Sequence, residues 1–219
     1  AERVLKSRQL ESPYQRMNDH QIDIVIEKDY ENFDIYLCGQ HVYVRYLTQK
    51  ERWTMGFGNW IYGLMLNKVT ESQVRRNTQA YINVIKNNPL DAVTHLNYLC
   101  PSYAVEVAKC AADYGTYIEL NSKKDHLTDD ELNDIVQKTD ARFIINSDAH
   151  AAERVGDTAL VETQLARIGF PMDRIDNIEG RYPKFRFAEY KKQQRDEHSV
   201  ILKNIVKKYR MYVTVKTET

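Results

Sequence analysis

The chain has 219 residues, 42% of them hydrophobic and 28% charged, as expected for an ordinary globular protein with one full core. Its 31 Lys and Arg balance its 31 Asp and Glu, which argues against recruitment by net charge to nucleic acid or an anionic membrane. No apolar run approaches the ~18 residues of a membrane span, and the first residues lack the charged-then-apolar layout of a signal peptide. Cys38, Cys100 and Cys110 form no close pair, which favours reduced thiols in the cytoplasm.

The first third of the chain predicts short strands followed by a long connection. Residues 22–27 alternate apolar and acidic side chains, as in a strand with one exposed face, and a more apolar strand is predicted over residues 33–38. We expect an ordered loop after it, because glycines alternate with aromatic residues there. These residues are Trp53, Gly56, Gly58, Trp60 and Gly63.

Helices and strands alternate from residue 70 onward. Capping and breaking residues predict helices over about residues 70–86, 101–114, 127–138 and 157–168. Strands are predicted at 91–95, 116–121 and the start of 142–150, with a last, peripheral strand at 175–178. This alternation predicts right-handed βαβ units around a parallel sheet or barrel.

The composition changes near residue 188. Lys and Arg become frequent after it, and apolar residues between 200 and 209 predict an amphipathic helix. Packing on the barrel or on a partner subunit is favoured over a membrane-surface role. We therefore predict a barrel domain over residues 1–187 and a C-terminal tail over 188–219 that serves packing or oligomerisation.

Polar side chains follow several of the predicted strands. They are Glu11, His41, His95, Glu119, Asn121, Asp148 and His150. The carboxyl ends of parallel strands meet at one edge, so these side chains are expected to converge. Imidazoles and carboxylates suit Zn²⁺, Mn²⁺ or Fe²⁺, and the absence of thiols nearby favours a hydrolytic over a structural site.

Each of these residues also has a structural interpretation. His41 and His95 fit a capping or core role when considered singly, and Glu119 and Asn121 fit hydrogen bonding to neighbouring backbone. Their joint position at successive strand ends favours the metal site. His20, His126 and His198 lie in polar contexts and are expected at the surface.

The ordered motifs resemble those of the polymerase-and-histidinol-phosphatase (PHP) family over about residues 8–180. Asn146-Ser147-Asp148-Ala149-His150 is similar to its final motif, and Gly39-Gln40-His41 to its strand ending in Gly-x-His. Three further matches are Leu10-Glu11, Thr94-His95 and Glu119-Leu120-Asn121.

The resemblance implies a distorted seven-stranded (β/α)7 TIM-like barrel that hydrolyses phosphate esters, such as histidinol phosphate, with two or three metal ions. It implies that Glu11, His41, His95, Asp148 and His150 bind metal. Asp148 and His150 would also be catalytic, and Arg154 would bind the phosphate of a small-molecule substrate through its planar guanidinium.

The chain also departs from the family pattern. The leading His-x-His and Thr-Asp-His strands are not found, Gln9-Leu10 replaces Gly-Val, and Leu96 replaces the Pro after His95. We therefore expect an N-terminally incomplete barrel with about five of seven strands. Its open edges predict pairing with another copy, with a complementing N-terminal fragment, or with its own tail.

The sequence is compatible with three functions. The first is a metal-dependent phosphoesterase whose site is incomplete in this chain, so that these residues alone have little activity. The second is a catalytically inactive remnant kept for structure or binding, and the third is an unrelated metal-dependent amidohydrolase barrel. Retention of five ligand-type residues in order favours the first.

Overall fold

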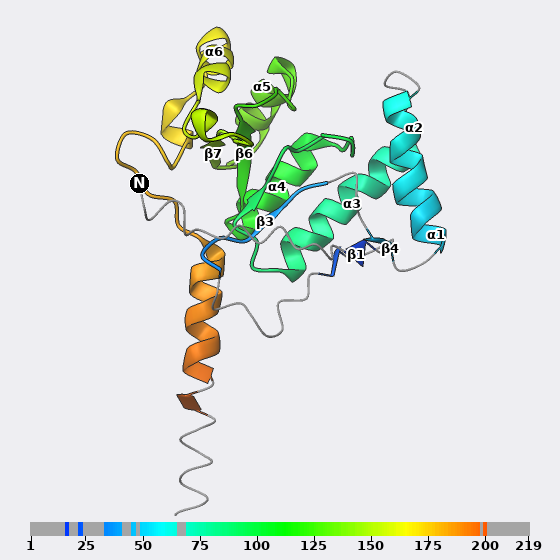
Figure 1. Cartoon of the computed structure of the whole chain (residues 1–219), viewed down its shortest axis with the longest axis horizontal. Helices are drawn as coiled ribbons and strands as arrows, with labels where there is room; N and C mark the ends of the chain where they lie inside the picture. Colours follow the sequence, from blue (N-terminus) through cyan, green and yellow to red (C-terminus); the bar gives the residue numbers. More distant parts are fainter. Residues whose placement is uncertain are drawn as a thin grey trace, which may run out of the picture.

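The computed structural model describes most of the chain from residue 33 to residue 200 and two short earlier segments (Figure 1). The described residues are 16–17, 22–23, 33–40, 45–46, 49–64, 69–197 and 199–200.

A parallel sheet lies at the centre of the described fold. Its order is β3 (Leu37–Cys38), β5 (Ala92–Val93), β6 (Tyr117–Asn121) and β7 (Phe143–Asn146), and every neighbouring pair is parallel. A second, smaller sheet has the order β2 (Ile22–Asp23), β1 (Arg16–Met17), β4 (Arg45–Tyr46). The α/β class with a parallel sheet is therefore confirmed, and the four strands are compatible with part of a barrel.

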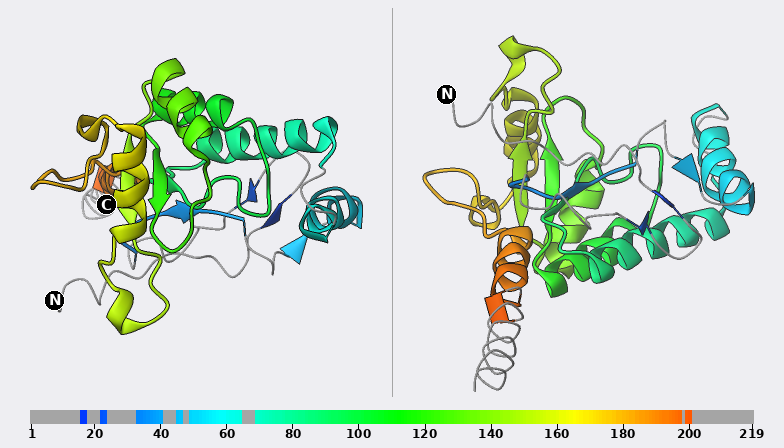
Figure 2. Two further views of the ribbon diagram at one scale, coloured as in Figure 1. Left: turned by 90° about the horizontal axis from the view of Figure 1, so that it is seen from above. Right: turned by 60° about the horizontal axis from the view of Figure 1, so that its bottom comes forward.

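Four helices follow the strand order on the outside of this sheet. They are α3 (Glu71–Asn87), α4 (Ala104–Tyr114), α5 (Asp129–Lys138) and α6 (Ala159–Ile168). Each packs beside the next, and α4 also packs on β6, so helices and strands form two concentric arcs (Figures 1 and 2). This is the arrangement expected of consecutive βα units.

Local sequence signals set the ends of these helices. Thr70 caps α3 by accepting a hydrogen bond from Gln73 N, as its side chain predicts. Thr128 and Glu131 form a reciprocal capping box at α5. Gly115 and Gly169 end α4 and α6 at φ of 67° and 62°, a left-handed conformation that favours glycine.

The loop prediction for the long connection is wrong. The chain forms α1 (Gln49–Glu51), a π-helix η3 (Arg52–Phe57) and α2 (Gly58–Leu64) there. Gly58 lies close to α3, where a Cβ on it would be 2.9 Å from Oε1 at the end of the Gln73 side chain. A glycine that allows two helices to approach closely cannot be distinguished in the sequence from a glycine in a loop, because the approach depends on tertiary packing.

The predicted peripheral strand at residues 175–178 is reduced to a single bridge, between Ile175 and Phe143. A short 3-10 helix, η5 (Met172–Arg174), precedes it. The Asn177 side chain then accepts a hydrogen bond from Ile145 N at 2.9 Å and donates one to Ile145 O at 2.7 Å. Those are the bonds that a backbone would make in a longer strand, so the side chain ends the pairing.

The helix after residue 185 begins inside the predicted barrel domain. It covers residues 186–197, and Phe187 in its first turn is fully buried against the Tyr36 ring, with centroids 5.6 Å apart. Lys191, one turn later, is also buried, and the remainder of the helix extends away from the sheet (orange in Figure 1). The division at residue 188 stays a prediction, as does the role of the tail. Among the helices of the described residues, none has both the length and the apolar character required to cross a membrane.

The two faces of the parallel sheet differ because strand side chains alternate. Val93, Ile118, Leu120 and Phe143 belong to the large core shared with the helices. On the opposite face Ala92, Tyr117 and Ile144 form a small apolar cluster with Leu37 and Phe185. Towards the carboxyl ends of β6 and β7 this second face becomes polar, and the candidate site lies there.

Candidate functional site

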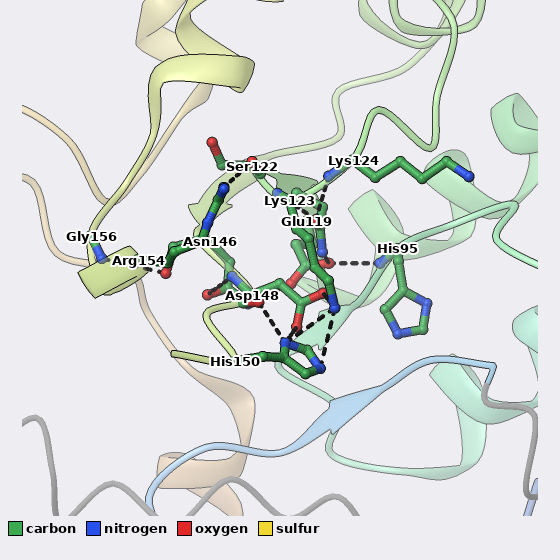
Figure 3. A network of polar contacts seen from close by, with 12 residues as sticks. His95, Glu119, Ser122, Lys123, Lys124, Asn146, Asp148, His150, Arg154 and Gly156 are labelled. Carbon is green, nitrogen blue, oxygen red and sulfur yellow. Dashed lines mark hydrogen bonds and ion pairs between the residues drawn. The ribbon is translucent and has the colours of Figure 1, made fainter. Parts of the chain in front are cut away.

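The buried carboxylate of Glu119 joins three strand ends at the carboxyl edge of the sheet (Figure 3). Its Oε2 accepts hydrogen bonds from His95 N at 2.7 Å and from Asn121 Nδ2 at 3.1 Å. Its Oε1 accepts one from Asn146 Nδ2 at 2.6 Å. Only 4% of Glu119 is exposed, and burial raises its pKa despite these three donors. Both oxygens are occupied by protein donors, which gives Glu119 a positioning role.

His95 follows β5 and is buried, with 8% of its surface exposed. Its imidazole lies against the backbone of Gly39 at the end of β3. A Cβ on Gly39 would overlap Thr94 Oγ1 and His95 Cε1 and would lie 2.7 Å from His95 Nε2. Gly39 is therefore required by the close approach of this imidazole, and the ring faces the end of β3, the strand that leads to His41.

The loop after β5 is held in an uncommon backbone conformation. His95, Asn97 and Leu99 have φ values of 35°, 71° and 53°, in the left-handed region that L-residues avoid at about 1 kcal/mol or more each. Asn97 stabilises the loop by accepting from Ser102 N and Oγ and donating to Glu131 Oε1. The predicted ligand His95 thus sits at the start of a strained, tightly hydrogen-bonded loop.

Asp148 and His150 follow β7 on an exposed turn. Asn146 connects this turn to Glu119, because its Oδ1 accepts from Asp148 N at 3.3 Å while its Nδ2 binds Glu119. Asp148 has a φ of 46°. His150 Nδ1 lies 2.9 Å from Asp148 O and 3.7 Å from Asp148 Oδ1. The two predicted ligands are close neighbours on one surface.

Lys123 places a cation beside that pair, which the sequence interpretation missed. Its Nζ lies 3.1 Å from His150 Nδ1, 3.2 Å from His150 Nε2 and 3.8 Å from Asp148 Oδ2. Lys123 continues the alternation of Glu119 and Asn121 beyond the end of β6. That spacing of two residues was the signal available in the sequence.

Arg154, the predicted phosphate ligand, lies on the 3-10 helix η4 (Ala152–Arg154). Its Nη2 is 3.2 Å from Asp157 Oδ2 and donates to Ser122 O at 3.5 Å. In Figure 3 its guanidinium is directed to Ser122, whereas Lys123 reaches the Asp148–His150 pair. A role in binding phosphate stays a prediction.

The surface assignment of His126 is wrong, because this residue is half-buried beside the site. Its ring centroid lies 4.9 Å from that of Tyr98 and 5.8 Å from that of His95. Burial, followed by the charge of Lys124, lowers the pKa of His126 to about 4. A polar sequence context did not reveal that the loop after β6 folds over His95. His20 and His198 lie outside the described residues.

Two of the five predicted metal ligands, Glu11 and His41, also lie outside the described residues. The structure brings the other three, His95, Asp148 and His150, to the carboxyl edge. Their imidazole and carboxylate atoms fit Zn²⁺, Mn²⁺ or Fe²⁺ by chemistry. Within the described ranges, no three His, Cys, Asp or Glu side chains lie close enough to hold one ion. The metal assignment therefore stays a prediction that depends on the full ligand set.

Comparisons with known proteins find similarity to probable phosphatases. The chain is 34% identical over 109 residues to one from Aliivibrio fischeri (strain MJ11), covering 45% of this chain and 43% of the relative. It is 28% identical over 146 residues to one from Shewanella halifaxensis (strain HAW-EB4), covering 61% and 57%. It is also 28% identical over 120 residues to one from Clostridium botulinum (strain Hall), covering 51% and 49%.

These matches span about half the length of each relative. No protein-family model matches the chain. The comparisons therefore identify relatives named as probable phosphatases. They do not identify a more specific family or a substrate.

Proposed function

We propose that this chain contributes part of the active site of a metal-dependent phosphoesterase of the PHP type, which hydrolyses phosphate monoesters such as histidinol phosphate. The observation that carries the proposal lies at the carboxyl edge of a parallel sheet, where buried Glu119 holds the His95 backbone and, through Asn146, the turn that carries Asp148 and His150. Similarity to probable phosphatases supports the same reaction class. The four parallel strands would be an arc of the distorted (β/α)7 barrel.

The proposed metal ligands are Glu11, His41, His95, Asp148 and His150. A divalent Zn, Mn or Fe ion would lower the pKa of a water molecule towards ~7 and polarise a phosphoryl oxygen. The chain's own residues prepare this site. Glu119 holds the His95 backbone and, through Asn146, the Asp148 backbone, so two ligands share one buried support.

Arg154 is the proposed substrate-binding residue. It is half-exposed, with its guanidinium held near Ser122 and Asp157, and it lies on the helix that follows the Asp148–His150 turn. Its planar donors suit the oxygens of a phosphate monoester.

The test is the metal content of the purified chain, measured by elemental mass spectrometry without chelator or added metal. We expect one or more equivalents of Zn, Mn or Fe, and loss of most of the metal in His95→Ala and Asp148→Ala. Asp134→Ala is the matched control, because it removes an exposed carboxylate on α5, and this variant should keep the metal. Hydrolysis of p-nitrophenyl phosphate is then measured with the same proteins.

The results separate the two leading functions. Bound metal that depends on His95 and Asp148 would support the phosphoesterase, whatever the rate of p-nitrophenyl phosphate hydrolysis. A chain that retains no metal, or whose metal is unaffected by both substitutions, would overturn the proposal. It would favour a catalytically inactive module for structure or binding.

A further inference from the structure

We infer that Lys123 is a tethered cation that occupies the Asp148–His150 ligand pair and competes there with a divalent metal ion. This inference rests on the proposed function, because it assumes that the pair can bind metal. It assigns a role to a residue outside the predicted ligand set, and that role determines how tightly this chain holds its metal.

The contacts of Lys123 Nζ are those of a cation among metal-type donors. The ammonium lies 3.2 Å from His150 Nε2 and 3.8 Å from Asp148 Oδ2. Nε2 is the ring nitrogen with a lone pair, because Nδ1 donates its hydrogen to Asp148 O at 2.9 Å. Imidazole nitrogen and carboxylate oxygen are also the donors that Zn²⁺ and Mn²⁺ take. Figure 3 shows the side chain crossing from the end of β6 to the turn after β7.

The fold places the Lys123 backbone through the same network that supports the ligands. Asn121 Oδ1 accepts hydrogen bonds from Lys123 N at 2.9 Å and from Lys124 N at 3.2 Å. Asn121 in turn donates to Glu119, the carboxylate that also holds His95 and Asn146. These hydrogen bonds fix the backbone at Lys123, so a change in the position of Nζ requires only a rotation of the side chain.

The Lys123 ammonium and a metal ion bound to Asp148 and His150 would repel each other. A divalent ion bound to His150 and Asp148 would lie about 2.0–2.2 Å from each ligand atom, hence within a few ångströms of Nζ. Two cations at that distance repel each other, because the short separation leaves little room for solvent between the charges. The Lys123 side chain is 47% exposed, so it can swing into solvent when metal binds. The result is competition, with weaker metal binding than the two ligands alone would give.

Removing the charge should therefore strengthen metal binding. The experiment is isothermal titration calorimetry of the full chain with Zn²⁺, in buffer without competing ligands. Lys123→Met, which keeps the apolar stem, should bind Zn²⁺ at least about tenfold more tightly than the wild-type chain. Lys123→Arg keeps the charge and should remain within about threefold of wild type.

Lys124→Met is the matched control. Lys124 is the neighbouring exposed lysine, and its Nζ lies 6.0 Å from the Tyr98 ring centroid. Loss of that charge should change the Zn²⁺ affinity less than about threefold, because the Lys124 side chain extends away from the Asp148–His150 pair (Figure 3). The double variant Lys123→Met/Asp148→Asn should lose the added affinity, which locates the ion at this pair.

A second measurement follows the lysine itself. Zn²⁺ should increase the rate at which an amine-reactive acetylating reagent modifies Lys123, because the bound ion displaces Nζ into solvent. The rate at Lys124 should not change. Peptide mass spectrometry reads both sites in one sample.

The outcomes distinguish this inference from the proposed function. If wild type and Lys123→Met bind Zn²⁺ equally and both depend on Asp148, Lys123 is not a competitor and the metal site stands. If neither binds Zn²⁺, metal dependence and the inference both fail. Tight binding by Lys123→Met that Asp148→Asn does not reduce would place the ion elsewhere and overturn the inference.

Discussion

Two buried carboxylates lie at opposite edges of the parallel sheet and have different uses. Asp91 precedes β5 at the amino edge and is fully buried, and it accepts hydrogen bonds from Tyr36 N at 2.8 Å and Phe187 N at 2.9 Å. Glu119 at the carboxyl edge accepts from one backbone and two side-chain donors. Asp91 joins elements distant in sequence, whereas Glu119 arranges candidate ligands, so similar chemistry serves assembly at one edge and a site at the other.

The largest expected effect is the loss of the amino-edge carboxylate. Asp91→Ala leaves two buried backbone N–H groups without an acceptor and should lower the free energy of unfolding by about 4 kcal/mol. Urea denaturation followed by circular dichroism measures it. The exposed Asp34→Ala control should change stability by less than about 0.5 kcal/mol. The Zn²⁺ affinity of folded Asp91→Ala should stay near wild type, and its loss would contradict the division between the two edges.

Loss of Glu119, the carboxylate at the carboxyl edge, should lower both the stability of the fold and the affinity for Zn²⁺. Glu119→Ala removes the acceptor of three donors and should lower the free energy of unfolding by about 3 kcal/mol. It should also weaken Zn²⁺ binding by about 10- to 100-fold, because it orients His95 and Asp148 from outside the ligand set. Glu106→Ala, exposed on α4, is the control for both measurements. Unchanged Zn²⁺ affinity in a folded Glu119→Ala protein would make Glu119 purely structural.

The amino edge should also respond to pH. Burial raises the pKa of Asp91 to about 6, from an ordinary value of 3.8. A raised pKa means that the folded state binds the proton more tightly, so this stabilisation is complete below pH 4 and lost as pH rises through 6. Between pH 4 and 7, wild type should lose about 2 kcal/mol relative to Asp91→Asn. Parallel urea titrations at several pH values measure the difference, and a constant difference would show that Asp91 does not titrate in this range.

The smallest expected effect on stability comes from the backbone beside His95. Gly39→Ala adds a methyl group that overlaps Thr94 and the His95 ring, and should cost about 1 kcal/mol in unfolding free energy. The displaced imidazole should weaken Zn²⁺ binding at least about tenfold. Gly58→Ala is the matched control, because its methyl group meets only the movable end of Gln73. Equal Zn²⁺ affinity in Gly39→Ala and Gly58→Ala would show that His95 does not bind the metal ion.

Much of the candidate site could be anticipated because it follows from strand periodicity. The alternation of side chains along β6 put Glu119 and Asn121 on one face, and parallel pairing placed Asn146 directly beside Asn121. That Glu119 would accept hydrogen bonds from three protein donors was not predictable, since two of them come from β7 and from the loop after β5. The position of Lys123 two residues after Asn121 was visible in the sequence, but its contacts with Asp148 and His150 were not, because those residues are remote in sequence. The same holds for His126 beside His95.

The sequence by itself determined the local elements of this protein. Thr70, Thr128 with Glu131, Gly115 and Gly169 set helix ends through contacts within a few residues, and the βα alternation followed from them. Only the tertiary structure decided that residues 49–64 are helical and that Asn177 ends the last pairing. It alone placed Lys123, and not Arg154, against Asp148 and His150. Caps and periodicity are short-range effects, whereas close packing and charge pairing depend on segments that meet only after the chain has folded.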